Sequence, residues 1–192
     1  MPNPLLIDIP ESLVTERLLL RPPRRGDGPV LHEAIVESLP ALRQFLASLP
    51  WVAEEQTHQS AELFCRNSAA NVAARKDLPY LLFQRDTGRL LGACGLHRTQ
   101  WEVPKTEIGY WLRTSEAGRG YASEAVHALV DAARTCIGAV RIEIITDEHN
   151  LASRKVAERC GFQLEGVLRN ERRDPQGVLR NTCVYALLTA AA

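Results

Sequence analysis

The chain has 192 residues, of which 45% are hydrophobic and 24% are charged, a composition typical of one globular domain with its own core. Its 23 basic and 23 acidic side chains balance, so it lacks the positive excess of a nucleic-acid-binding protein. No uncharged apolar stretch reaches the roughly 18 residues that a membrane span needs. We therefore expect a single domain over residues 1–192, with a core from about 14 to 189, and neither a nucleic-acid nor a membrane partner.

The N-terminus and the cysteines indicate the cellular compartment. Residues 1–10 contain no Lys or Arg and no long apolar run, so they do not have the pattern of a signal peptide. The five cysteines are widely spread and form neither a Cys-x-x-Cys pair nor a metal-ligand spacing with the five histidines. These features favour reduced thiols in a cytoplasmic protein without a metal.

The first third of the chain predicts one strand and two helices. A strand is expected at 15–21, where two prolines end it. Apolar residues at helical spacing from Val30 onward predict a helix that ends near Pro40. A second helix is expected over 57–75, and the segment 41–55 between them is expected to be irregular or weakly helical. The face of the second helix that we expect to be buried carries Ala61, Phe64, Ser68 and Val72.

The middle of the chain predicts a hairpin, a further strand, the clearest helix and another strand. The hairpin strands are 79–84 and 90–97, and the turn between them is Arg-Asp-Thr-Gly. An apolar and aromatic strand is expected at 106–112. Apolar residues at helical spacing then predict a helix over 120–137, and a β-branched run predicts a strand at 140–146.

The last part of the chain predicts one short helix and two strands. Asn150 suits the N-cap of a helix over 151–160, and Gly161 suits the left-handed position after its end. Strands are expected at 162–169 and 178–188. The resulting order of elements predicts a mixed sheet with helices over its faces.

The connection between the strand at 106–112 and the helix at 120–137 is rich in glycine, with Gly118 and Gly120 around Arg119. The first turn of a helix leaves four N–H groups without intrahelical partners, and the helix dipole adds partial positive charge there. Glycine lets the backbone come close to phosphate oxygens, because it has no β-carbon. The connection therefore predicts an anion site made of backbone N–H groups, with a plain tight turn as the alternative.

Two common nucleotide motifs do not fit this connection. A P-loop requires Gly-Lys-Ser/Thr, and the chain has Gly120, Tyr121 and Ala122 there. A dinucleotide fingerprint requires Gly or Ala where Ser123 stands, and an acidic residue about 20 positions later. Residues 139–142 are Ala-Val-Arg-Ile and contain no acid, so both nucleotide interpretations are weak.

The connection instead resembles the pyrophosphate loop of the GNAT superfamily of N-acetyltransferases, written Q/R-x-x-G-x-G/A. Ser115 stands where that pattern has Gln or Arg, which removes one long side chain but not the backbone cradle. Residues 15–21 resemble the first strand of the branch that acetylates ribosomal-protein N-termini (RimJ/RimL-type). Residues 150–162 resemble the second signature segment, and 164–166 with 185–188 resemble the end of that branch.

The resemblance implies a GNAT fold: an α+β domain with a mixed, mostly antiparallel sheet of six to seven strands and helices on both faces. A V-shaped acetyl-CoA cleft would split this sheet between 106–113 and 140–147. Acetyl-CoA would serve as the acetyl donor, and no metal is implied. The residues that the resemblance places at the cofactor are Trp111, Leu112, Arg113, Gly118, Arg119, Gly120, Tyr121, Ala122, Ser123, Asn150 and Ser153.

In such an enzyme the amine attacks the thioester directly, and the protein supplies orientation and proton transfer. Glu107 is the candidate base for the amine, with a structural carboxylate as the alternative. The Ser153 hydroxyl is the candidate proton donor to the thiolate, with a helix-capping role as its alternative. His97 and His149 are weaker candidates. Glu171 lies close to the mechanistic acid of ribosomal-type relatives, but the register places Arg172 at that position.

The acceptor is expected to be chosen by residues 40–55 and by the hairpin at 169–180. An α-amine has a pKa of about 7.7–8.0 and a lysine amine one of about 10.4, so lysine costs about 3.4 kcal/mol more to deprotonate. This favours a protein N-terminus, such as that of a ribosomal protein. A small amine (a polyamine or a drug) and a non-catalytic acetyl-CoA-binding module are the alternatives, and the sequence is compatible with a homodimer.

Overall fold

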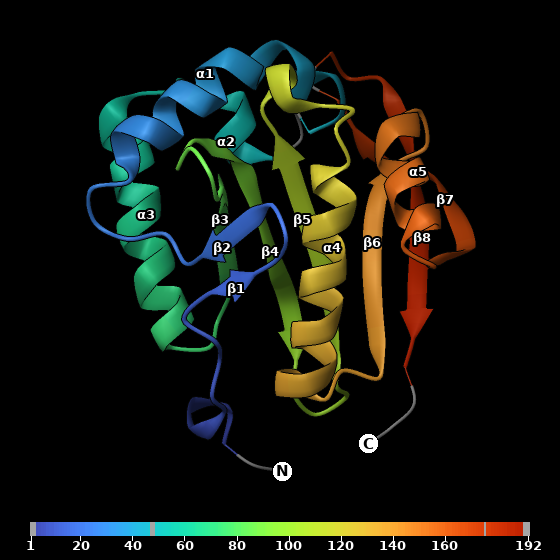
Figure 1. Ribbon diagram of the computed structural model, residues 1–192. Coiled ribbons are helices and arrows are strands. Elements are labelled where there is room, and N and C mark those ends of the chain that lie inside the picture. Colours follow the sequence, from blue (N-terminus) through green and yellow to red (C-terminus); the bar gives the residue numbers. More distant parts are fainter. Residues whose placement is uncertain (1–2, 47–48, 175, 190–192) are drawn as a thin grey trace.

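The computed structural model describes residues 3–46, 49–174 and 176–189. Its centre is an eight-stranded sheet with the order β1-β2-β3-β4-β5-β6-β8-β7 (Figure 1). Neighbouring strands are antiparallel except for β5 and β6, which are parallel. The strands are β1 (Leu13–Val14), β2 (Leu18–Arg21), β3 (Leu78–Gln84), β4 (Leu90–Gln100), β5 (Lys105–Leu112), β6 (Arg141–Asp147), β7 (Gln163–Arg173) and β8 (Leu179–Leu188).

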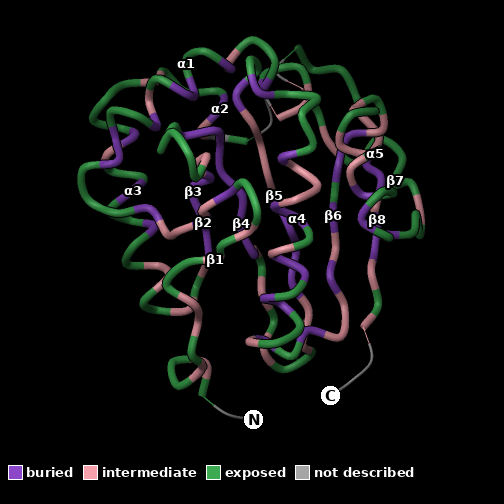
Figure 2. The backbone as a smooth tube through the Cα atoms, in the orientation of Figure 1, coloured by how far each residue is buried: buried purple, intermediate pink, exposed green. Residues whose placement is uncertain are grey.

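Helices cover both faces of this sheet, as expected. Side chains of α1 and α3 form one buried cluster with the sheet, and side chains of α4 and α5 form the larger one on the opposite face. Figure 2 shows the central strands as mostly buried, whereas β7 at the edge is mostly exposed. The helices are α1 (Gly28–Phe45), α2 (Pro50–Ala53), α3 (His58–Ala73), α4 (Tyr121–Ala132) and α5 (Leu151–Arg159). None of them is long and apolar enough to cross a membrane.

Side-chain caps fix where two of these helices begin. Thr57 and Ser60 form a reciprocal capping box before α3, with both bonds at 3.0 Å. Asn150 accepts a hydrogen bond from the Ser153 N–H at 3.1 Å and caps α5. Gly161 follows α5 with a φ of 84°, so the expected cap at each end of this helix is confirmed.

The sheet is split where β5 and β6 part. These strands pair only from Lys105 opposite Arg141 to Glu107 opposite Glu143. Beyond that point β6 continues beside β8, and no described strand pairs with this edge of β5. In Figure 1, α4 passes in front of this part of the sheet, on the face where it is packed. The V-shaped split expected between these two strands is thus present.

Several details differ from the sequence-based expectations. The sheet has eight strands rather than six or seven, because the two-residue β1 pairs with β2, and nothing in its sequence marks a strand. The helix α1 continues through Pro40 to Phe45, although proline removes one helical hydrogen bond. The continuation is stabilised because Leu42 is buried and Arg43 donates to the Val52 carbonyl at 3.3 Å.

The buried face of α3 also differs from the expected one. Phe64 is 42% exposed, and the neighbouring Cys65 is fully buried instead. Ala61 and Ser68 are buried as expected, so the inward stripe steps by four and then three residues through Cys65. The aromatic Phe64 was expected in the core because it is large and apolar, but the smaller Cys65 next to it takes the inward position.

Candidate active site

The loop before α4 has the geometry of an anion cradle. Gly118 and Gly120 have φ values of 78° and 82°, a region that side chains with a β-carbon rarely adopt. The Glu124 N–H makes the first hydrogen bond inside α4, to the Gly120 carbonyl at 3.1 Å. The N–H groups of residues 121–123 precede that bond, and no side chain caps them. They are therefore available to a phosphate, so the loop fits the pyrophosphate of acetyl-CoA.

Arg17, from the turn before β2, holds this loop in place. Its guanidinium donates to the Arg119 carbonyl at 3.0 Å, lies 4.6 Å from the centre of the Tyr121 ring, and forms an ion pair with Glu124 at 2.6 Å. Burial opposes ionisation of Glu124, but hydrogen bonds from Thr15 and Arg17 outweigh it and lower the pKa of the carboxyl. Arg17 and Glu124 were not among the predicted site residues, although both lie in segments that carried the family resemblance.

Ser115, which departs from the family pattern, faces α1 rather than the anion cradle. Its hydroxyl donates to Glu37 at 2.6 Å, and its backbone N–H donates to the same carboxylate at 3.2 Å. The hydrogen bond from Ser115, together with those from Arg113, lowers the pKa of Glu37 to about 2. Ser115 therefore joins the loop to α1.

Arg113 has a structural side chain. Only 2% of the residue is exposed, and the guanidinium forms ion pairs with Glu33 at 3.0 Å and Glu37 at 2.5 Å. Its backbone N–H is also engaged, because it donates to the Leu91 carbonyl at 2.7 Å. Among the predicted cofactor residues, Arg113 thus has neither its side chain nor its N–H directed to the split.

The phase of the β4–β5 ladder shows which backbone groups of β5 face the split. Antiparallel strands alternate between residues that bond the partner and residues that point away from it. Because Arg113 bonds β4 and the register is regular from Gly92 opposite Leu112 onward, the N–H and C=O groups of Tyr110 and Leu112 point towards β6. The Trp111 side chain lies on the α1 face, where its ring centre is 6.2 Å from that of Trp51.

A pair of hydroxyl groups bridges the two arms of the split. The Tyr110 hydroxyl on β5 lies 2.9 Å from the Ser153 hydroxyl in the first turn of α5, and it donates to the Ser153 carbonyl at 3.2 Å. Burial raises the pKa of Tyr110 to about 12, so its hydroxyl stays protonated at neutral pH. Tyr110 is a site residue that the sequence did not single out, because an aromatic residue in a strand is usually part of the core.

Glu107 lies at the apex of the split and is bound by Arg98. The residue is 7% exposed, and both of its carboxylate oxygens accept hydrogen bonds from the Arg98 guanidinium, one of them at 2.8 Å. Arg98 has a φ of 50° at an irregularity of β4, which brings its side chain back over β5. The hydrogen bond to Glu107 raises the pKa of Arg98. A base role for Glu107 stays a prediction.

The remaining candidates lie on both sides of this apex. The Nδ1 atom of His97 is 2.8 Å from an Asp77 carboxylate oxygen. Glu171 accepts a hydrogen bond from the Thr182 hydroxyl at 2.7 Å. Arg172 has two buried nitrogens without a hydrogen-bond partner, one of them 3.9 Å from Asp147.

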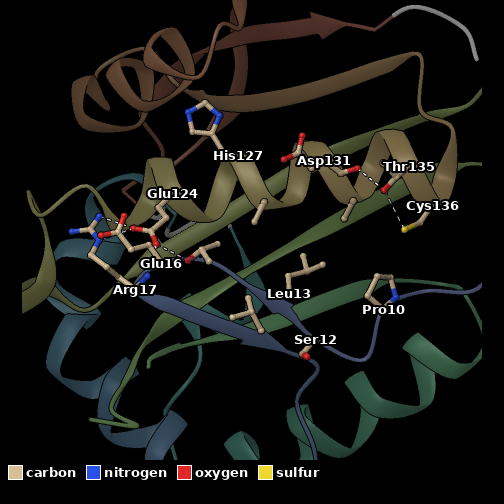
Figure 3. Close-up of a pocket in the computed structure, with 14 residues that line it drawn as sticks. Pro10, Ser12, Leu13, Glu16, Arg17, Glu124, His127, Asp131, Thr135 and Cys136 are labelled. Carbon is tan, nitrogen blue, oxygen red and sulfur yellow. Dashed lines mark hydrogen bonds and ion pairs between the residues drawn. The ribbon is translucent and has the colours of Figure 1, made fainter. Parts of the chain in front are cut away.

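A hollow of about 970 Å³ is lined by Arg17 and Glu124, beside the anion cradle, and extends along α4. It separates residues 10–17 from the outer side of α4, where His127 and Asp131 line it (Figure 3). Neither Glu107 nor Ser153 lines it. Within the part of the chain that the structure describes, no group of three or more His, Cys, Asp or Glu side chains could hold a metal ion.

Comparisons with known proteins agree with this geometry. Residues 17–163 match the family model described as an acetyltransferase (GNAT) domain. The chain is 30% identical, over 93% of its length and 96% of the relative, to an uncharacterised N-acetyltransferase, p20, of Bacillus licheniformis. It is 34% identical over 90 residues, 47% of this chain and 49% of the relative, to a ribosomal-protein-serine acetyltransferase of Escherichia coli K12.

The fold agrees as well. A RimL ribosomal L7/L12 α-N-protein acetyltransferase, solved with coenzyme A, superposes with a TM-score of 0.85 at 24% identity, covering 95% of this chain and 100% of that one. At that identity the likeness shows the shared fold. The family match covers more than half of the chain and includes the α4 loop and the Asn150–Ser153 segment. The chain therefore belongs to the GNAT family of acetyltransferases, and it is an acyltransferase.

Proposed function

We propose that this acetyltransferase transfers the acetyl group of acetyl-CoA to the α-amine of a protein N-terminus, such as that of a ribosomal protein. The observation that carries the proposal is the parting of β5 and β6 beyond Glu107, with the unbonded N–H groups of α4 on one side of the split. The resemblance to RimL-type enzymes and the lower deprotonation cost of an α-amine support the choice of acceptor.

Each arm of the split has its own task in this proposal. The N–H groups of residues 121–123 bind the pyrophosphate, and the backbone of Tyr110 and Leu112 hydrogen-bonds the pantetheine arm. The Ser153 hydroxyl donates a proton to the departing sulfur. Asn150 holds the first turn of α5, and with it Ser153, in position.

The proposal is tested by incubating the enzyme and acetyl-CoA with a panel of N-terminal peptides, polyamines and drugs that carry a primary amine. The acetylated products are detected by mass spectrometry. Acetylation of peptide α-amines is the expected result. Preferential acetylation of a small amine would contradict the proposed protein N-terminal acceptor, whereas acetyl transfer to an amine would still stand. Binding of acetyl-CoA without any turnover would instead indicate a non-catalytic binding module.

The anion cradle is tested separately by Gly120→Glu. A β-carbon at a φ of 82° and a negative charge at the phosphate position should weaken CoA binding at least about tenfold. Gly88→Glu is a matched control, because Gly88 is also exposed, has a φ of 67°, and lies in the distant β3–β4 turn. Calorimetric titration of both folded variants with CoA decides the point, and equal affinities would refute the placement of the pyrophosphate.

We further propose that the enzyme works in the cytoplasm, as free cysteines favour a reducing compartment, and that it forms a homodimer. The dimer is supported by apolar side chains that β7 and β8 expose, Leu164 at 44%, Leu168 at 49% and Leu179 at 43%. Light scattering during gel filtration measures the mass in solution. A mass of 21.3 kDa would contradict the dimer.

A further inference from the structure

An Asp–His pair lies beside the split. Asp77, just before β3, is 2.8 Å from Nδ1 of His97 on β4. About 31% of the His97 side chain and 34% of the Asp77 side chain are exposed, so the pair is in contact with solvent. A carboxylate at this distance stabilises the tautomer that carries its proton on Nδ1. The lone pair is then on Nε2, the ring nitrogen turned away from Asp77.

Two glycines make room for this imidazole. A β-carbon on Gly95 would lie 2.8 Å from Nε2 of His97, and one on Gly109 would lie 3.2 Å from the same atom. The ring therefore lies flat across β4 and β5, with Nε2 over both glycines. Gly109 is on the strand that borders the split, two residues beyond the last position at which β5 pairs with β6. Nε2 thus lies over β4 and β5, next to a residue of the strand that borders the split and on the sheet face that α1 and α3 cover.

The competing base is already occupied. Both oxygens of Glu107 accept hydrogen bonds from the Arg98 guanidinium, so an incoming ammonium group would have to compete with Arg98 for them. Nε2 of His97 has no hydrogen-bond partner among the described residues. The charged groups around the imidazole are Asp77, the Arg98–Glu107 pair and, opposite Glu107 on β6, Glu143.

We propose that His97, oriented by Asp77, is the catalytic base that takes the proton from the acceptor amine. The proposal rests on the acetyl transfer proposed above and names a residue for its proton transfer. An imidazole is suited to this task because its ordinary pKa of about 6.5 lies close to neutral pH.

The proposed transfer releases one proton for each acetyl group moved. The acceptor arrives as an ammonium ion and gives one proton to Nε2 of His97, from which it passes to water. The neutral nitrogen attacks the thioester carbonyl carbon, the C–N bond forms, and the C–S bond breaks. The departing thiolate takes one proton, for which the Ser153 hydroxyl is the proposed donor. The nitrogen loses its second proton as the amide forms, and this proton passes through water to restore the Ser153 hydroxyl. The products are the acetylated amine, coenzyme A as a thiol, and one proton in solution.

The decisive experiment measures kcat/KM against pH for the native enzyme and for His97→Gln, with whichever amine the native enzyme acetylates. The variant should lose about 10²–10⁴-fold in kcat/KM at pH 7, the usual worth of a general base. The loss should shrink above pH 8 and with weakly basic acceptor amines, because these are already neutral. The dissociation constant for CoA should not change. His127→Gln is the matched control, since His127 is exposed on the outer side of α4.

Two further variants separate chemistry from structure. Asp77→Asn should lower kcat by a smaller factor, and the ¹⁵N NMR shifts of His97 should report loss of the Nδ1–H tautomer even without substrate. Glu107→Gln should lower thermal stability and keep the native pH profile.

A native-like rate in His97→Gln, or a loss of rate that is constant across pH and amine basicity, would overturn the proposal. So would a pH-dependent loss in Glu107→Gln alone, which would assign the base to Glu107. A native enzyme that acetylates no amine would refute the proposed function, and an unaltered His97 tautomer in Asp77→Asn would separately refute the orienting role of Asp77.

Discussion

At the scale of single residues, the site is built from contacts that join segments far apart in the sequence. Asn150 and Ser153 were predictable because a capping residue three positions before a polar partner is a local pattern. Tyr110 and Asp77 were not, because their partners are 43 and 20 residues away, at Ser153 and His97. The residue types and their spacing in the sequence therefore located residues within one helical turn. Partners on distant elements could be found only from the folded structure.

Ser153→Ala separates the acid role of this residue from its capping role. The cap uses the Ser153 backbone N–H, which alanine retains, so the stability of α5 should hardly change. Loss of the hydroxyl should lower kcat by at least about tenfold if it protonates the sulfur. Steady-state kinetics and thermal melts check this, with Asn150→Ala as the reverse case. That variant should lose about 0.5–2 kcal/mol of stability with the cap. An equal kcat in Ser153→Ala would leave the Tyr110 hydroxyl or water as the proton donor.

At the scale of elements, strands and helices followed the apolar period wherever that period was long. The hairpin of β3 and β4 and the strand β6 lie within about three residues of their predicted bounds at either end. The helix predicted over 120–137 is α4, which ends at Ala132, followed by a π-helical turn over Ala133–Ile137. The errors fall where tertiary contacts outweigh local preference. Proline at position 40 predicted a helix end, but packing of Leu42 carries α1 onward to Phe45. The strand β1 exists because β2 offers it an edge, which no local pattern shows.

The contact between α1 and the loop before α4 should make stability depend on pH. Hydrogen bonds from Ser115 and Arg113 lower the pKa of Glu37 to about 2, whereas an unfolded glutamate has one of about 4.3. A lowered folded-state pKa stabilises the protein above pH 4.3, and this contribution disappears as pH falls from there towards 2. Urea unfolding between pH 2 and 5 should show a steeper loss in the native protein than in Glu37→Gln. Parallel curves would mean that Glu37 is not linked to folding.

At the scale of the whole molecule, the family, the split sheet and the anion cradle were predicted from the sequence, because the two signature segments have fixed local spacing. The acceptor side was harder to predict. We expect it to involve residues 40–55 and the hairpin 169–180, of which residues 47–48 and 175 lie outside the described residues. Arg172 on β7 and Asp147 on β6 approach to 3.9 Å from different strands, and a single sequence does not report such pairs.

Burial of the thiols gives a test of the fold as a whole. Cys65, Cys94, Cys160 and Cys183 are buried, and only Cys136 is partly exposed. Burial raises the pKa of Cys65 to about 12 and also raises that of Cys94, which disfavours their thiolates. A thiol reagent should therefore modify Cys136 rapidly. The other four cysteines should react at least about a thousandfold more slowly, because they become accessible only when the core opens. In denaturant all five should react at once.

Modification at Cys136 should leave acetyl transfer intact, because Cys136 lines the hollow beside α4, and neither Ser153 nor Glu107 does. Timed labelling with mass detection measures both quantities. Rapid reaction of a second cysteine would contradict the packing described here. A loss of activity that acetyl-CoA prevents would place a thiol at the active site, against direct transfer to the amine.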